Sequence, residues 1–154
     1  MDHRITLGVR HTLEPYSNVR PEDVKRHAYA IVTWALPPWP CAGLGSLLTS
    51  TIPQLPLYTT ILMKVVQSGG TLIDVGCYCG TDLRRLIFDA APQDNLFGTD
   101  LVNQWDLGFE LFRDQDKLQV KFIEVDILNP NTELEVLNGK MDVISATHFL
   151  HNWN

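Results

Sequence analysis

The chain has 154 residues, of which 45% are hydrophobic and 19% are charged, which argues for about one folded domain and against a disordered chain. Its 12 basic and 18 acidic residues leave a formal net charge of −6, so binding of nucleic acid or an anionic membrane through bulk charge is disfavoured. No run of about 20 apolar residues and no secretory signal is visible, and the three cysteines are too few for a disulfide framework. We therefore expect a cytoplasmic protein with reduced thiols.

The first 69 residues are rich in proline and only partly periodic. Apolar residues recur at three- and four-residue spacing over 24–35, which predicts a helix with Pro21 in its first turn. A second, shorter helix is expected over 57–67, and 39–56 is expected to be a loop with apolar anchors. We interpret 1–69 as a helical, proline-rich segment that serves as a lid or a dimerisation element.

From residue 70 onward, predicted strands and helices alternate. Strands are expected at 71–75, 95–100, 120–127 and 141–147, and helices at 83–90, 105–112 and, opened by Thr132 as a capping residue, 132–139. This alternation predicts an α/β fold, with a parallel sheet and helices on both faces. Ligands of such sheets bind beyond the carboxyl ends of the strands, so those ends are the place to look for function.

Three consecutive predicted strands end in an aspartate: Asp74, Asp100 and Asp126. The carboxylate of Asp100 is suited to accept both hydroxyl groups of a ribose, because an ionised carboxylate offers two acceptor oxygens. Asp126 and its apolar neighbour Ile127 are suited to the edge and face of an adenine. Taken singly, each aspartate could instead cap a helix or lie in a solvated loop, and the functional interpretation rests on their joint placement.

The turn after the first strand excludes one common ligand. A dinucleotide-binding fingerprint would need glycines at 78 and 81, where this chain has Tyr78 and Thr81. Asp74 and Asp82 flank the turn and would repel a pyrophosphate. An adenosine with a cationic remainder fits better, and S-adenosylmethionine is such a ligand. We interpret Asp82 itself as a first-turn residue favoured by the helix dipole, not as a ligand contact.

Several motifs resemble class I S-adenosylmethionine-dependent methyltransferases, in particular those of fungal secondary metabolism, including meroterpenoid pathways. They are 72–77 with Gly80, 98–101, 126–127, and 142–144 followed by 148–151. The resemblance implies a partial Rossmann-like domain over 70–154 with its strands in the order 3-2-1-4. Relative to the seven-stranded family sheet, the fourth strand would be an exposed edge.

The resemblance also implies which residues hold the cofactor. The turn after the first strand would hold the methionine part, the end of the second strand the ribose, and the end of the third strand the adenine. Residues 145–148 would line the site near the methyl group. The cofactor contacts expected on this basis are Asp74, Gly76, Cys77, Gly80, Asp100, Leu101, Asp126, Ile127 and Thr147.

The predicted function is transfer of a methyl group to a carboxyl or hydroxyl oxygen of a small apolar metabolite, without a metal. A truncated, inactive methyltransferase-like protein that keeps part of the cofactor site is the alternative, and another nucleotide-binding α/β enzyme is a weaker one. His148 is weighed as a general base, but a packing or pocket-lining role is favoured because a carboxylate acceptor needs no base. Cys77 and Cys79 are interpreted as packing residues, and a homodimer is expected.

Overall fold

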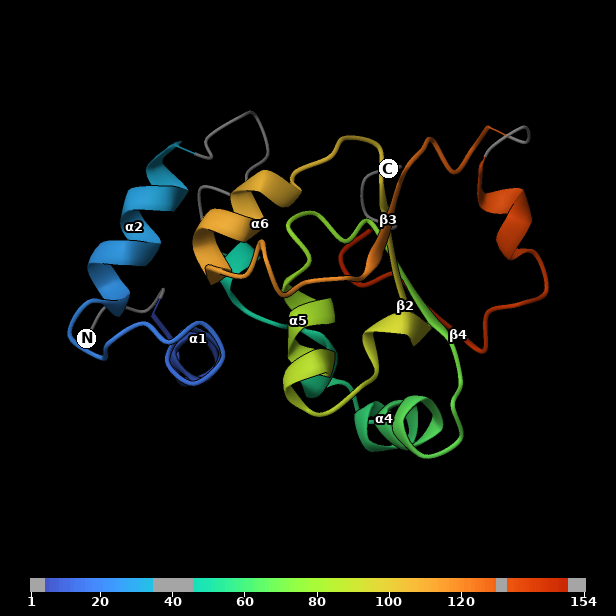
Figure 1. Cartoon of the computed structure of the whole chain (residues 1–154), viewed down its shortest axis with the longest axis horizontal. Coiled ribbons are helices and arrows are strands. Elements are labelled where there is room, and N and C mark those ends of the chain that lie inside the picture. The colour runs from blue at the N-terminus through green and yellow to red at the C-terminus, as the bar shows by residue number, and fades with distance from the viewer. Residues whose placement is uncertain (1–4, 35–45, 130–132, 150–154) are drawn as a thin grey trace.

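Four short strands form one parallel sheet in a computed structural model that describes residues 5–34, 46–129 and 133–149 (Figure 1). The strands are β1 (Leu72–Val75), β2 (Leu96–Asp100), β3 (Lys121–Glu124) and β4 (Val143–Ser145). Their order is β3-β2-β1-β4, and each neighbouring pair is parallel. The predicted α/β class and the predicted strand order are confirmed.

The last two strands are shorter than predicted. β3 ends at Glu124, so Asp126 and Ile127 lie beyond it and not at its tip. The Asp126 carboxylate accepts the N–H of Leu128 at 2.9 Å, and its carbonyl accepts the N–H of Asn129 at 2.9 Å. An aspartate that accepts hydrogen bonds from the backbone that follows it favours a turn over continued pairing with the neighbouring strand. This explains the early end of β3.

The helices are distributed unequally over the two faces of the sheet. Helices α4 (Tyr58–Val66), α5 (Thr81–Phe88) and α6 (Trp105–Phe112) share one hydrophobic core with β1 and β2. The connection from β3 to β4 runs on the opposite side and carries the 3-10 helix η4 (Glu133–Leu137) (Figure 1). Right-handed crossovers account for this, because the chain moves one way from β1 to β3 and reverses at β4. The second face therefore carries a 3-10 helix at the place where a short helix was predicted over 132–139; Thr132 lies outside the described residues.

The segment before the sheet holds one helix that was not predicted. α1 (Leu7–Leu13) begins after Thr6, whose side chain accepts the N–H of Val9 at 3.3 Å. Its buried residues Val9 and Leu13 lie four apart, a helical signal too short to stand out in a polar, proline-containing stretch. The predicted helix appears as α2 (Val24–Trp34), and 39–56 contains, among its described residues, the 3-10 helices η1 (Ser46–Leu48) and η2 (Ile52–Gln54).

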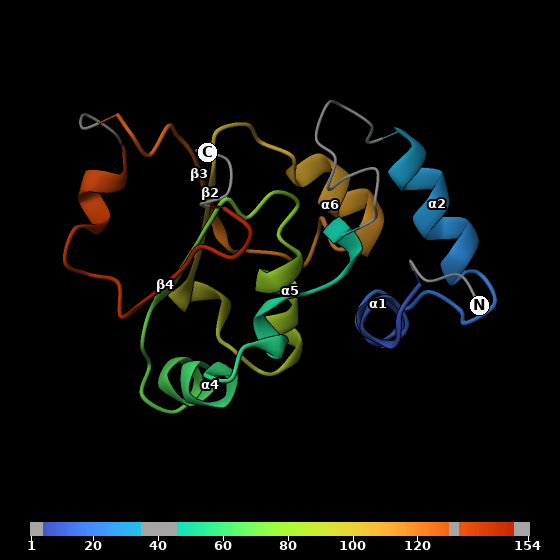
Figure 2. The same ribbon diagram turned by 180° about the vertical axis from the view of Figure 1, so that it is seen from behind.

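A second hydrophobic core joins the amino-terminal helices to the rest of the molecule. It gathers Val9, Leu13, Val24 and Ala28 with Phe112 of α6 and its neighbours. Seen from behind, α1 and α2 lie beside α6, at the end of the molecule away from β4 (Figure 2). Within the described ranges, no helix is long and apolar enough to cross a membrane. The lid or dimerisation role of 1–69 stays a prediction.

Candidate functional site

The turn after β1 is a glycine loop that comprises residues 76–80. Gly76 and Gly80 have φ of +74° and +71°, a region that residues with a Cβ rarely adopt. The N–H groups of Gly76 and Cys77 both donate to the carbonyl of Thr99, at 2.8 and 3.2 Å, and that of Gly80 donates to the carbonyl of Cys77 at 2.7 Å. The loop is therefore fastened to the end of β2 and folded on itself.

Asp100 holds the middle of the glycine loop at the end of β2. One carboxylate oxygen accepts the N–H of Tyr78 at 2.8 Å, and the other accepts the N–H of Leu101 at 2.8 Å. Tyr78 has φ of +50°, which is unfavourable for a bulky residue, and the bond to Asp100 offsets part of that strain. Each oxygen keeps a further lone pair, so the half-buried Asp100 can still accept hydrogen bonds from a ligand.

Asp74 is a buried carboxyl, 4% exposed, in the middle of the sheet. Burial raises its pKa well above the usual value, and the carboxylates of Asp82 and Asp100 raise it further, whereas the Ser145 hydroxyl acts in the opposite direction. No cation is among the groups that shift this pKa in the described part of the chain. A buried carboxyl ionises readily only when a cation or several donors reach it, so Asp74 is suited to receive a positively charged group.

Asp82 fastens an upstream segment to the start of α5. Its carboxylate accepts hydrogen bonds from the Ser50 hydroxyl at 2.5 Å and from the N–H and hydroxyl of Thr51, both at 2.7 Å. It also accepts the N–H of Ile52 at 3.2 Å and the hydroxyl of Thr147 at 3.1 Å. The carboxylate is thus occupied by the protein, as its interpretation as a non-ligand residue requires, and it also places the predicted contact Thr147 beside α5.

Phe149 covers the first glycine of the loop. A Cβ added to Gly76 would lie 2.3 Å from Cδ2 of Phe149, so the aromatic ring rests directly on the glycine backbone. The preceding residue, His148, is exposed and has φ of +53°. Sequence reasoning missed Phe149 as a site residue, although it lies within a motif that carried the family resemblance. The possible role of His148 as a base stays untested, and His151 lies outside the described residues.

Asp126 and Ile127 are both exposed beyond the end of β3. The N–H of the preceding residue, Val125, donates to the carbonyl of Asp100 at 2.9 Å. Exposed apolar side chains follow both β2 and β3: Leu101, Val102, Ile127 and Leu128. The carboxyl ends of these two strands therefore present an apolar surface next to Asp100. The charges of Asp82 and Asp100 both act on Asp74. The predicted grouping of Asp126 with Asp74 and Asp100 stays a prediction.

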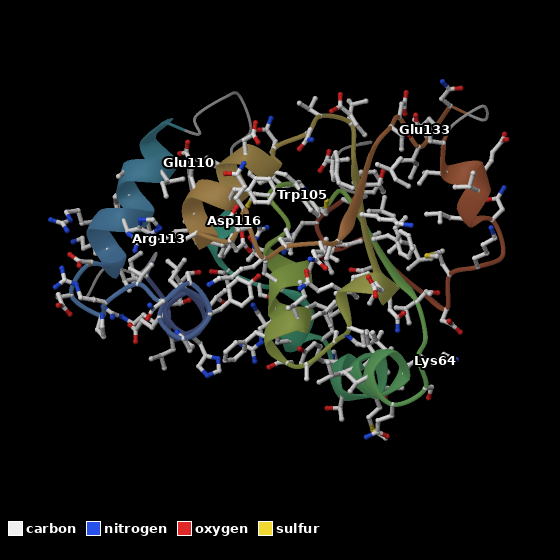
Figure 3. All side chains as sticks on the ribbon, in the orientation of Figure 1. Lys64, Trp105, Glu110, Arg113, Asp116 and Glu133 are labelled. Atoms are coloured by element: carbon white, nitrogen blue, oxygen red, sulfur yellow. The ribbon has the colours of Figure 1, made fainter. Side chains whose placement is uncertain are left out.

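The cysteines of the loop are packing residues, as predicted. Cys77 and Cys79 are buried free thiols, and burial raises the pKa of both. A Cβ on Gly98 would lie 3.0 Å from the Cys77 sulfur and 3.0 Å from Trp105, the first residue of α6 (Figure 3). Among the described His, Cys, Asp and Glu residues, no three gather as a metal site.

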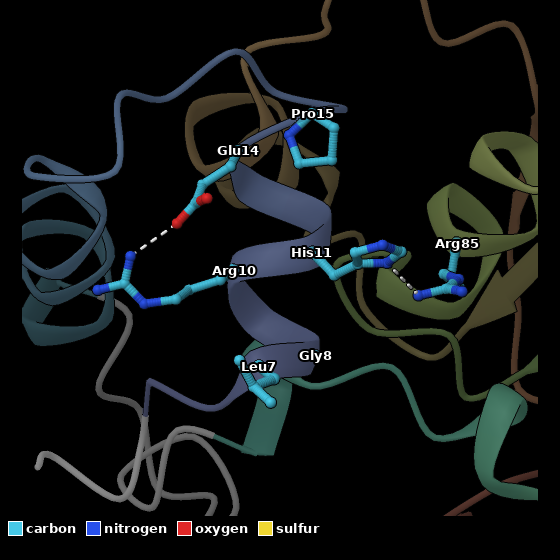
Figure 4. Close-up of a pocket in the computed structure, with 7 residues that line it drawn as sticks. All are labelled: Leu7, Gly8, Arg10, His11, Glu14, Pro15 and Arg85. Atoms are coloured by element: carbon cyan, nitrogen blue, oxygen red, sulfur yellow. Dashed lines mark hydrogen bonds and ion pairs between the residues drawn. The ribbon is translucent and has the colours of Figure 1, made fainter.

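A separate groove runs along α1 and holds none of the predicted site residues. It is lined by Leu7, Gly8, Arg10, His11, Glu14, Pro15 and Arg85 (Figure 4). The two arginines that border it are already paired, Arg10 with Glu14 at 2.6 Å and Arg85 with Asp89 at 2.7 Å. The groove therefore offers little free charge to a ligand, and the candidate site is the glycine loop with the neighbouring strand ends.

The sheet order, the glycine loop and the carboxylates beside the switch from β1 to β4 define a Rossmann-like α/β domain. The chain is similar to the O-methyltransferase atr3 of Stereocaulon alpinum, at 39% identity over 97% of this chain and 44% of that protein. It is 40% identical to the asnovolin E/chermesin D methyltransferase nvfJ of Aspergillus novofumigatus, over 96% of this chain and 54% of that protein. The methyltransferase adrK of Penicillium roqueforti is 36% identical, over 96% of this chain and 54% of that protein.

These similarities confirm the predicted resemblance to methyltransferases of fungal secondary metabolism. The chain spans about half the length of the curated relatives it matches. No protein-family model and no solved structure matches it.

Proposed function

We propose that the chain binds S-adenosylmethionine and takes part in methyl transfer to a carboxyl or hydroxyl oxygen of a small apolar metabolite. The observation that carries the proposal is the buried Asp74 carboxyl, whose pKa is raised by burial and by the carboxylates of Asp82 and Asp100. A site with this charge disfavours a phosphate-containing cofactor and favours a cationic one. The names of the similar proteins support the same reaction class.

The residues present fit this cofactor. Asp74 and the glycine loop would hold its methionine part, and Asp100 would accept hydrogen bonds from the ribose hydroxyls. The exposed apolar side chains of Leu101 and Ile127 would face the adenine, with Asp126 at its edge. When bound, the cofactor supplies an electrophilic methyl group on a sulfonium. Cys77 would contribute its backbone only, because its thiol is packed into the core.

The protein's own contribution to such a reaction is alignment and exclusion of water. An ionised carboxylate acceptor needs no proton removed, so no general base is required for it. Phe149 gives the site an apolar wall beside the glycine loop. The nature of the acceptor, a homodimer and a cytoplasmic location stay predictions.

Calorimetric titration with S-adenosylmethionine and its demethylated product tests the cofactor assignment. Both ligands should bind to the wild-type chain, and NADH should not. A methyl-transfer assay on a panel of apolar acids and phenols then tests activity. Cofactor binding without transfer to any acceptor would support the inactive methyltransferase-like alternative, and binding of NADH in place of S-adenosylmethionine would refute both.

A further inference from the structure

A fully buried arginine lies under the glycine loop. Arg84 of α5 is 0% exposed, and its Nη1 donates to the carbonyl oxygen of Cys79 at 2.5 Å. Its Nε and Nη2 donate to the two carboxylate oxygens of Asp114, at 2.7 and 3.0 Å. This two-point pairing holds the guanidinium in one orientation, so the bond to Cys79 is directed as well as charged.

The other end of this arrangement reaches the amino-terminal segment. The Tyr16 hydroxyl, a few residues after α1, donates to the same Asp114 oxygen that Arg84 Nε contacts, at 2.8 Å. Burial and the charge of Asp114 both raise the pKa of Tyr16, so the phenol keeps its proton and remains a donor. A continuous chain of hydrogen bonds thus runs from Tyr16 through Asp114 and Arg84 to Cys79.

The carbonyl oxygen of Cys79 is closely surrounded by α6 and Arg84. A Cβ on Gly108 of α6 would lie 2.5 Å from that oxygen, and a Cβ on Gly80 would lie 2.8 Å from Nη1 of Arg84. The guanidinium also lies over the ring of Phe112, 4.5 Å from its centroid. Two glycines therefore make room for a close contact between α6, Arg84 and the loop, and bulkier residues at either position would push them apart.

We propose that Arg84 is a positioning residue, which fixes the glycine loop from below and is itself held by Tyr16 through Asp114. The conformation of the loop then depends on docking of the amino-terminal segment. The consequence for ligand binding rests on the proposed function, in which this loop holds the methionine part of the cofactor. The consequence for loop order does not, because it concerns the ligand-free chain.

The test removes the Tyr16 hydroxyl, which begins the series of hydrogen bonds that ends at Cys79. Tyr16→Phe deletes the bond to Asp114 while both partners of the Asp114–Arg84 pair remain present, so that only the support of that pair is removed. Tyr58→Phe is the matched control, because the Tyr58 hydroxyl donates to Asp89, which pairs with the neighbouring Arg85. Amide hydrogen exchange of Gly80 is measured by NMR in the ligand-free chains. A lost hydrogen bond should speed it about 3- to 10-fold in Tyr16→Phe, with the amides of β1 unchanged.

The Tyr58→Phe control should leave the Gly80 amide at its wild-type rate. Unchanged exchange in Tyr16→Phe, or equal acceleration in the loop and in β1, would overturn the proposal. A second measurement compares the Kd of S-adenosylmethionine with that of adenosine. Tyr16→Phe should weaken the former about 3-fold or more and leave the latter unchanged. If the wild type binds neither ligand, the proposed function fails, whereas the exchange data still decide the role of Arg84.

Discussion

Arg84 and Arg85 are adjacent in α5 and enter two similar arrangements in very different surroundings. Arg84 pairs with Asp114, which also accepts the Tyr16 hydroxyl, in the interior, where the two charged side chains are 0% and 2% exposed. Arg85 pairs with Asp89, which also accepts the Tyr58 hydroxyl, near the surface, where the corresponding values are 18% and 19%. Arg85 also contacts His11 (Figure 4). The Arg84 set should therefore contribute more to stability than the Arg85 set, because water screens only the second set.

The largest expected effect comes from breaking the two ion pairs in turn. Asp114→Ala leaves the buried Arg84 guanidinium without its carboxylate and should lower the free energy of unfolding by about 3–5 kcal/mol. Asp89→Ala should cost about 1 kcal/mol or less, because Arg85 can turn to solvent. Urea denaturation of both variants measures the difference. Similar losses of unfolding free energy in the two variants would show that burial does not make the Arg84 ion pair more important for stability than the Arg85 ion pair.

A second comparison concerns two glycines with similar backbone angles. Gly76 has φ of +74° and lies against Phe149, whereas Gly139 has φ of +69° and nothing within 4 Å of an added Cβ. Gly139→Ala should cost about 1 kcal/mol from the backbone alone, and Gly76→Ala about 2–4 kcal/mol because the ring must also move. Thermal unfolding gives both values. Phe149→Ala in the Gly76→Ala background should recover part of the loss, and no recovery would argue against the contact.

Asp100 and Asp126 should differ in how much each contributes to cofactor affinity. Asp100 accepts two backbone N–H groups beside the loop, whereas Asp126 bonds only within its own exposed turn among the described contacts. Asp100→Ala should weaken binding of S-adenosylmethionine by about 1–3 kcal/mol, and Asp126→Ala by less. Calorimetric Kd values for the two variants test this order. An unchanged affinity in Asp100→Ala would identify Asp100 as a structural residue of the loop.

The smallest expected effect concerns two aspartates with opposite pKa shifts. Burial raises the pKa of Asp74 above 3.8, so its contribution to stability is lost as the pH rises through its folded pKa. Hydrogen bonds from Thr71 and the nearby Lys64 lower the pKa of the exposed Asp142, so its contribution is lost as the pH falls. Asp74→Asn should therefore stabilise the ligand-free chain at neutral pH while weakening cofactor binding.

Thermal unfolding across the pH range checks these signs. The wild type should lose stability relative to Asp74→Asn as the pH rises above 3.8. Asp142→Asn should instead be less stable than the wild type at neutral pH and should approach it in acid. Parallel profiles for wild type and Asp74→Asn would show that Asp74 does not titrate in the expected window.

The sheet was predictable from sequence because its signals are local. Leu72 to Val75 form an apolar run followed by glycine, and α5 and α6 carry apolar residues at helical spacing. α1 was not predicted, because two buried apolar residues in seven give a weak periodic signal and the second core supplies much of its stability. The predicted end of β3 failed for a different reason, since the turn at Asp126 outweighed the alternation of Ile123, Val125 and Ile127.

The sequence by itself determined the order of elements, the parallel sheet and the aspartates that follow its strands, because each is encoded within a few neighbouring residues. Only the tertiary structure decided which distant side chains meet. Thr147 reaches Asp82 across 65 positions, and Tyr16 reaches Asp114 across 98. Such pairs depend on how helices and strands pack, so no local pattern identifies Arg84 as the residue under the glycine loop or Phe149 as the residue that covers it.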